Sequence, residues 1–226
     1  MMTANYNHRV KALLRSVGSW GWRHPEWEKD VFYPDDLPAD WQLSYYANEF
    51  DLVVVPASYW GADGYTDEDW LDDVEEDFVF YIDWPFLQLA DLADYPHCAQ
   101  ACRQLGGQMA AVLVNNDIWQ QLDKEQRDCF EAETAGFEIL QYGSQPIAAY
   151  QQLTDAQNPV LAQDLATTKL LLVHSEQNEN LRDLSQRIMP WFQASSFQHV
   201  ILAEGDNMAR LKELQTLTTL LPEAIE

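Results

Sequence analysis

Positive charge is scarce in this sequence, which has 13 lysines and arginines against 37 aspartates and glutamates. The formal net charge of −24 repels a phosphate backbone, and no basic patch offsets it. We therefore predict that nucleic acid is not a partner. Residues 30–102 contain 18 acidic residues and no lysine or arginine. The densest acidic stretch, residues 67–77, predicts a helix whose acidic side faces water, or alternatively a surface for a cation or a basic partner.

Long hydrophobic runs are also missing. No apolar stretch approaches the roughly 20 residues of a membrane helix, and none of signal-peptide length precedes Gly18. The three cysteines are too few for a disulfide framework, which is typical of a reducing compartment. We predict a soluble cytoplasmic protein that has no membrane partner. The spacing of Cys98 and Cys102 predicts helix packing, with a zinc site as the alternative.

Several sequence motifs of catalysis and cofactor binding are absent. The sequence has no Gly-x-Ser-x-Gly, and Ser19 is not followed by the helix that a nucleophile elbow requires. Gly106 and Gly107 do not form a Gly-x-Gly-x-x-Gly loop, and a predicted strand follows them instead of a helix. These absences disfavour elbow-type hydrolases, nucleotide kinases and Rossmann dehydrogenases. We predict no cofactor.

The residues that are present predict one packed domain, residues 1–226, because 47% are hydrophobic and 12% are aromatic. Strand-like and helix-like segments alternate along it. The strand-like runs are residues 13–17, 52–55, 78–82, 110–114, 137–140, 147–150, 170–173 and 200–202. The helical segments are residues 40–50, 67–74, 97–105, 119–134, 178–192 and 207–221.

Strands separated by helices pair in parallel, which gives a doubly wound sheet or a closed barrel. Eight units of roughly 28 residues fit a compact or imperfect TIM-type (β/α)8 barrel, and we predict this α/β fold. Residues 142–168 are the exception, because Pro146 and Pro159 interrupt them and no long helical period emerges. We expect irregular structure there.

The N-terminal part resembles the opening of the YecE-like family, a domain of unknown function. The resemblance lies in a glycine-rich strand end followed by a tryptophan, a Phe-Tyr-Pro turn, a helix with a Tyr-Ala pair, and a second strand before an aromatic pair. The residues that carry it are Val17 to Trp22, Trp27, Phe32 to Pro34, Tyr45 to Ala47, Phe50, Tyr59 and Trp60. Weaker similarity follows at residues 112–119 and 171–175.

What the resemblance implies is a TIM-type barrel and no defined activity. The charged and polar residues that the family carries at its strand ends are replaced here. Val54 and Leu113 stand in place of glutamates, Pro56 in place of an asparagine, Asn115 in place of an arginine and Asn116 in place of a histidine. If those residues are the family's working groups, their replacement implies a degenerate site.

In a TIM-type fold a ligand site lies at the C-terminal ends of the strands. Two histidines follow predicted strands and suit acid–base work, His24 and His174, and a carboxylate of Asp83, Asp117 or Glu204 could orient one of them. The alternative is that both histidines only end their strands. A metal bound by His174, Glu204 and Asp83 also fits these positions, but no short spacing requires it, and we predict no metal site.

Aromatic and polar residues near the first strand ends predict a ligand pocket. Its candidate residues are Trp20, Trp22, Arg23, Tyr59 and Asn115. Arg23 is the candidate for holding an anionic group, and its alternative is a weak surface pair with a nearby glutamate. Five loop tryptophans predict an aromatic mouth for a sugar or planar ring, or else packing in the core. They are Trp20, Trp22, Trp27, Trp60 and Trp84.

Two functions remain open from the sequence. The first is a non-catalytic small-molecule binding or interaction protein on a degenerate barrel, which the lost strand-end charges favour. The second is a small-molecule enzyme that uses a histidine and a carboxylate for acid–base chemistry. An approach of two candidate side chains to within about 4 Å around a shared cavity would favour the enzyme.

Overall fold

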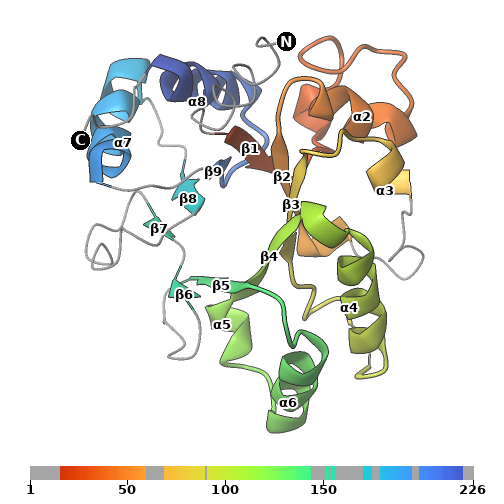
Figure 1. Cartoon of the computed structure of the whole chain (residues 1–226). Coiled ribbons are helices and arrows are strands. Elements are labelled where there is room, and N and C mark those ends of the chain that lie inside the picture. Colours follow the sequence, from red (N-terminus) through yellow and green to blue (C-terminus); the bar gives the residue numbers. More distant parts are fainter. Residues whose placement is uncertain are drawn as a thin grey trace, which may run out of the picture. The chain divides into compact units, whose positions relative to one another are not determined.

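The computed structural model describes residues 16–59, 69–89, 91–143, 151–152, 154–155, 170–174, 179–194 and 199–220 (Figure 1). The chain divides into two compact units. Unit 1 combines residues 1–37 with residues 154–226, and unit 2 is residues 38–153. The prediction of a single domain stays a prediction.

Unit 1 has four parallel strands in the order β1, β9, β8, β7. The strands are β1 (Ser16–Trp20), β7 (Thr154–Asp155), β8 (Leu170–Val173) and β9 (His199–Leu202). In the register of the sheet Val200 faces Val17 on one side and Leu171 on the other. All four residues of β8 are buried, as in parallel strands that are covered on both faces.

The helices of unit 1 are η1 (Pro25–Trp27), α7 (Leu181–Ala194) and α8 (Met208–Leu220). Asparagine side chains cap both long helices: Asn180 accepts from the main-chain N–H of Arg182 and Asp183, and Asn207 accepts from that of Arg210. Buried leucines recur every three residues along α8, which packs against β1.

Unit 2 has five parallel strands in the order β2, β3, β4, β5, β6. They are β2 (Leu52–Val55), β3 (Val79–Asp83), β4 (Met109–Asn115), β5 (Ile139–Tyr142) and β6 (Gln151–Gln152). Every residue of β2 is buried. This explains why short continuous apolar runs located most of the strands correctly.

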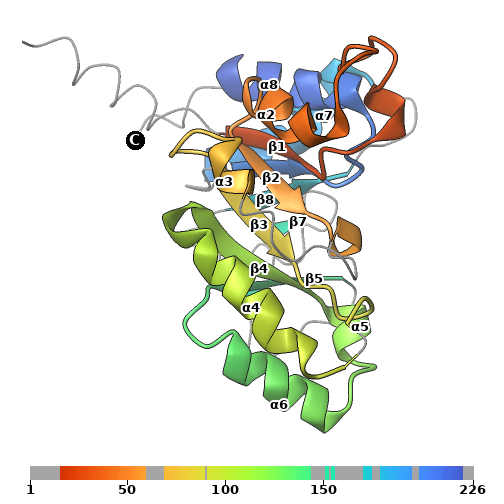
Figure 2. The same cartoon turned by 90° about the vertical axis from the view of Figure 1, so that its right-hand side faces the viewer.

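Eight helices and short helical turns are described in unit 2. They are η2 (Ala39–Trp41), α2 (Gln42–Ala47), η3 (Ala57–Tyr59), α3 (Asp69–Asp72), α4 (Asp94–Gln104), η4 (Gly106–Gln108), α5 (Asn116–Trp119) and α6 (Lys124–Glu133). Helices α4 and α6 pack side by side (Figure 2). The rings of Trp84, Phe86, Tyr95 and Phe130 contact one another in this core.

The helix predicted over residues 119–134 is present as α6 but begins five residues later than predicted. Helix α5 ends at Trp119, and α6 starts after Asp123. The Asp123 carboxylate accepts from the Gln126 N–H at 2.8 Å, and the Gln126 carboxamide oxygen accepts from the Asp123 N–H at 3.0 Å. This capping box begins a new helix where the apolar period alone suggested continuity.

Among the described residues, the strands predicted at 52–55 and 170–173 have the predicted limits, and the other predicted elements are present with shifted ends. Strand β5 begins two residues later than predicted and ends at Tyr142, because Gly136, in the left-handed region at φ +95°, turns the chain first. The predicted strand at residues 147–150, and most of residues 142–168, lie outside the described residues. In the part of the chain that the structure describes, no helix has the length and apolar character needed to cross a membrane.

Candidate functional site

The carboxyl ends of three neighbouring strands bring candidate residues of unit 1 to one edge of the sheet. Trp20 ends β1, and Arg23 and His24 follow it. His174 comes directly after β8, and Glu204 comes two residues after β9. Because these parallel strands pair in the order β1, β9, β8, the residues that follow them come to the same end of the sheet.

His174 and Glu204 form the closest pair among the predicted residues. The imidazole Nδ1 of His174 lies 2.8 Å from the carboxylate Oε1 of Glu204. Both strands lead directly to this contact, because Val173 pairs with Leu202 and the Ala203 N–H donates to the Val173 carbonyl at 2.9 Å. The side chains are 29% and 44% exposed, so molecules in solution can reach them.

His24, which follows β1, packs against Trp27 and Gly205. Its ring packs on Trp27 with the centroids 4.5 Å apart, and burial lowers its pKa below the usual value. Gly205, the residue after Glu204, fits closely against it. A Cβ atom at Gly205 would lie 2.5 Å from the Trp20 carbonyl oxygen and 2.8 Å from His24 Nε2. The β9–α8 turn is therefore packed on the end of β1.

We expect Gly205→Ala to destabilise unit 1 by about 1–3 kcal/mol, the usual cost of overpacking, because the added methyl group meets the main-chain carbonyl oxygen of Trp20, which cannot rotate away. Urea denaturation of purified protein measures the effect. Gly107→Ala is the matched control, since a Cβ there meets no atom within 4 Å. Equal stability of the two variants would contradict the close packing at Gly205.

The tryptophans of the predicted aromatic mouth differ in position. Trp22, Trp27 and Trp84 are buried, as in the packing alternative, and Trp60 lies outside the described residues. The Trp27 indole N–H donates to the Asp206 carbonyl at 2.9 Å. Arg23 is exposed, with its guanidinium carbon 5.5 Å from the centre of the Trp22 ring.

In unit 2, Asp83 ends β3 with a buried carboxyl group that is 8% exposed. The carboxylate accepts a hydrogen bond from the hydroxyl of Tyr142, the last residue of β5, at 2.7 Å. It accepts a second one from the main-chain N–H of Ala57, which follows β2, at 3.2 Å. Burial raises the pKa of Asp83 to about 6, although these two hydrogen bonds act in the opposite direction. A carboxyl group with this pKa can exchange a proton near neutral pH.

The other predicted residues of unit 2 lie at the end of β4, in α5 and at the end of η3. Asn115 caps α5, because its side-chain oxygen accepts from the Asp117 N–H at 2.9 Å. Asp117 is exposed, and Tyr59 ends η3 half-buried. Among the described residues, neither polar atom of the fully buried Asn116 carboxamide has a hydrogen-bond partner.

Sequence reasoning missed Tyr142, because it placed the strand two residues too early. A corrected strand end would have made Tyr142 a candidate in the same way as Asp83. The sequence distinguishes Asn116 only as a departure from the family, and no sequence signal indicates that it is buried.

The three candidate metal ligands are divided between the two units. His174 and Glu204 belong to unit 1, whereas Asp83 belongs to unit 2. In the described ranges no three histidine, cysteine, aspartate or glutamate side chains gather as a metal site would require. Cys98 and Cys102 are buried in α4, and burial raises the pKa of Cys102 to about 12, which disfavours the thiolate that zinc needs.

Comparisons with known proteins identify relatives of this fold. The sequence model of the family described as "Protein of unknown function DUF72" matches residues 16–114. A DUF72 family protein from Enterococcus faecalis V583 is 14% identical, with 93% of this chain and 99% of that chain covered and a TM-score of 0.60. A DUF72 family protein from Thermotoga maritima MSB8 is 13% identical, with 91% and 98% covered and a TM-score of 0.55. No curated protein matches the sequence.

At these identities the two solved structures show the fold alone. They confirm the predicted α/β fold of the imperfect TIM type. The resemblance to the YecE-like family, the domain of unknown function 72, is confirmed over residues 16–114.

Proposed function

We propose that this protein is a small-molecule enzyme that moves a proton with His174, which Glu204 orients. The observation that carries the proposal is the 2.8 Å contact between His174 Nδ1 and Glu204 Oε1 at the carboxyl ends of two paired strands. This edge is where TIM-type folds place their active sites. Histidine is also the side chain best suited to proton transfer near neutral pH.

The roles of the two residues follow from their geometry. The Glu204 carboxylate accepts the hydrogen of Nδ1, which fixes the orientation of the ring and the tautomer with the proton on Nδ1. The imidazole Nε2 then takes a proton from the substrate or returns one to it. Glu204 stabilises the imidazolium that forms in between, as a buried aspartate does in a catalytic triad. The exposed part of the His174 side chain gives a small molecule access to it.

Non-catalytic binding, the first of the two functions predicted from the sequence, is the alternative. The replaced strand-end residues favour it. One of them, Asn115, caps α5 with its side-chain oxygen, so this position serves the local structure and not a reaction. Both functions share a small-molecule ligand and differ in whether that ligand is changed. A test must therefore detect binding and conversion in the same sample.

We would incubate the protein in heavy water with a fixed panel of hydroxy acids, sugars, sugar phosphates and amino acids. Proton NMR then follows conversion, deuterium incorporation and binding by saturation transfer. We expect at least one compound to be converted or deuterated. We expect His174→Asn to slow that reaction by about 10²–10⁴-fold, the usual contribution of a general acid or base. Asparagine keeps a donor for Glu204 but does not titrate.

His97→Asn is the matched control, because His97 is exposed on α4. We expect this variant to react at the wild-type rate. An unchanged rate in His174→Asn would contradict the proposed role of His174. A compound that binds without conversion or deuteration would favour the non-catalytic alternative.

A further inference from the structure

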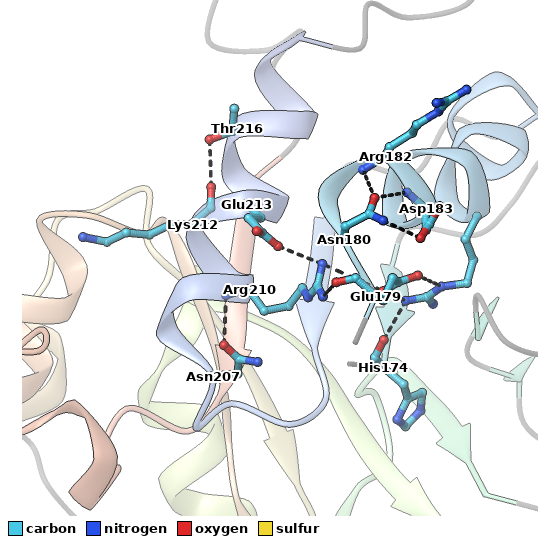
Figure 3. Close-up of polar contacts among 11 residues, drawn as sticks. His174, Glu179, Asn180, Arg182, Asp183, Asn207, Arg210, Lys212, Glu213 and Thr216 are labelled. Carbon is cyan, nitrogen blue, oxygen red and sulfur yellow. Dashed lines mark hydrogen bonds and ion pairs between the residues drawn. The ribbon is translucent and has the colours of Figure 1, made fainter. Parts of the chain in front are cut away.

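Four charged residues of unit 1 form a cluster of ion pairs, which we call the arginine–glutamate network: Glu179, Arg187, Arg210 and Glu213. Figure 3 shows Glu179 beside Arg210 and Glu213, with His174 below Glu179. The network is largely buried, since the side chains of Glu179 and Arg210 are 5% and 7% exposed. Buried charges in such a network hold their partners in fixed geometry.

Arg187, on α7, connects this network to the main chain of His174. Its Nε and Nη2 donate to the two carboxylate oxygens of Glu179, each at 2.8 Å. The same Nη2 donates to the His174 carbonyl oxygen, also at 2.8 Å. One planar guanidinium therefore holds both the Glu179 carboxylate and the His174 carbonyl, and its fixed fork defines their separation.

The network is anchored in turn on α8. Arg210 donates through Nη2 to the Glu179 carbonyl, and its Nη1 lies 2.7 Å from the Glu213 carboxylate. Helix α8 packs against β1, so the anchor belongs to the core of unit 1. Glu204 is fixed separately by the end of β9. The contact between His174 and Glu204 thus depends on two supports, one of which is Arg187.

We propose that Arg187 is a positioning residue, which fixes the His174 main chain and thereby keeps the imidazole on Glu204. The inference rests on the proposed function, since it gives Arg187 a part in the same proton transfer. A displacement of about 1 Å at a reacting group can cost 10²-fold in rate, so a support of this kind matters for catalysis. Arg187 itself touches no reacting atom.

Proton NMR of the ¹⁵N-labelled full chain tests the proposal without a substrate. The Nδ1–H of His174 is assigned as the imidazole resonance that Glu204→Gln shifts and His174→Asn removes. We expect Arg187→Met to abolish this resonance through faster exchange with water while the protein stays folded. Arg187→Lys should retain a broadened resonance, because an ammonium group can still donate to Glu179 or to the His174 carbonyl.

Arg182→Met is the control, because Arg182 lies on the same helix with an exposed side chain that Figure 3 shows pointing away from His174. We expect its spectrum to match that of the wild type. A purely structural role for Arg187 would lower stability and leave the resonance of the folded protein unchanged, and that result in Arg187→Met would overturn the proposal. If Arg187→Met does not fold, an unchanged resonance in Arg187→Lys would overturn it instead.

A wild-type protein without the resonance would also overturn the inference, since it requires a formed hydrogen bond between His174 and Glu204. The proposed function fails by a different result, an unchanged reaction rate in His174→Asn. The two failures can therefore be told apart.

Discussion

Glu179→Gln is expected to lower the free energy of unfolding by about 3–5 kcal/mol, the loss typical when one partner of a buried ion pair is removed. Glutamine matches the shape of glutamate but carries no charge, so Arg187 and Arg210 keep two buried positive charges without their shared carboxylate. The new amide N–H also faces an arginine donor. Urea denaturation followed by circular dichroism measures the change.

Glu213→Gln is the control for this prediction. Glu213 also pairs with Arg210, but its side chain is 39% exposed, and we expect a loss of about 1 kcal/mol or less. The contrast between the two variants separates buried from solvent-screened charge in one network. A loss in Glu179→Gln no larger than that in Glu213→Gln would contradict a structural role for the buried carboxylate.

Asp83→Asn is expected to change how stability depends on pH. Burial raises the pKa of Asp83 from 3.8 to about 6, so between these values the folded protein binds a proton more tightly than the unfolded chain does. Ionisation of Asp83 therefore lowers the free energy of unfolding of the wild type as pH rises from about 4 through 6. Asparagine does not ionise, so the variant does not lose this stability. From pH 4 to pH 7 the variant should gain up to about 3 kcal/mol relative to the wild type.

The substitution suits the site, because asparagine can accept from the Ala57 N–H and donate to the Tyr142 hydroxyl oxygen. Urea denaturation at pH 4.5 and pH 7.5 gives the difference. Asp72→Asn removes an exposed carboxylate from α3 and provides the background. If the stability of Asp83→Asn relative to the wild type were the same at both pH values, the buried position of Asp83 would not raise its pKa.

Continuous apolar runs predicted the strands because burial on both faces leaves little room for polar residues. Leu170 to Val173 and Leu52 to Val55 are buried throughout, so their limits could be predicted from the sequence. Helix ends were harder to predict. The capping box of Asp123 and Gln126 sets the start of α6 five residues after the predicted helix start, and only its hydrogen bonds make the boundary evident.

The candidate residues could be predicted individually, because His174 and Glu204 follow apolar strands. Their contact could not be predicted, since it depends on β8 pairing with β9 and on the register of that pair. The role of Arg187 was beyond the sequence for a similar reason. A guanidinium that reaches the main-chain carbonyl of a residue 13 positions away has no local pattern to indicate it.

The division of the chain has a consequence for the order of folding. Unit 2 is one continuous segment, whereas unit 1 combines both ends of the chain, and its strand β1 pairs with β9 about 180 residues later. During synthesis, unit 2 can therefore begin to fold before β9 has been made and can pair with β1. Long-range pairings of this kind form slowly, so we expect β1 to join β9 late in folding, after the more local pairing of β8 with β9 that brings His174 to Glu204.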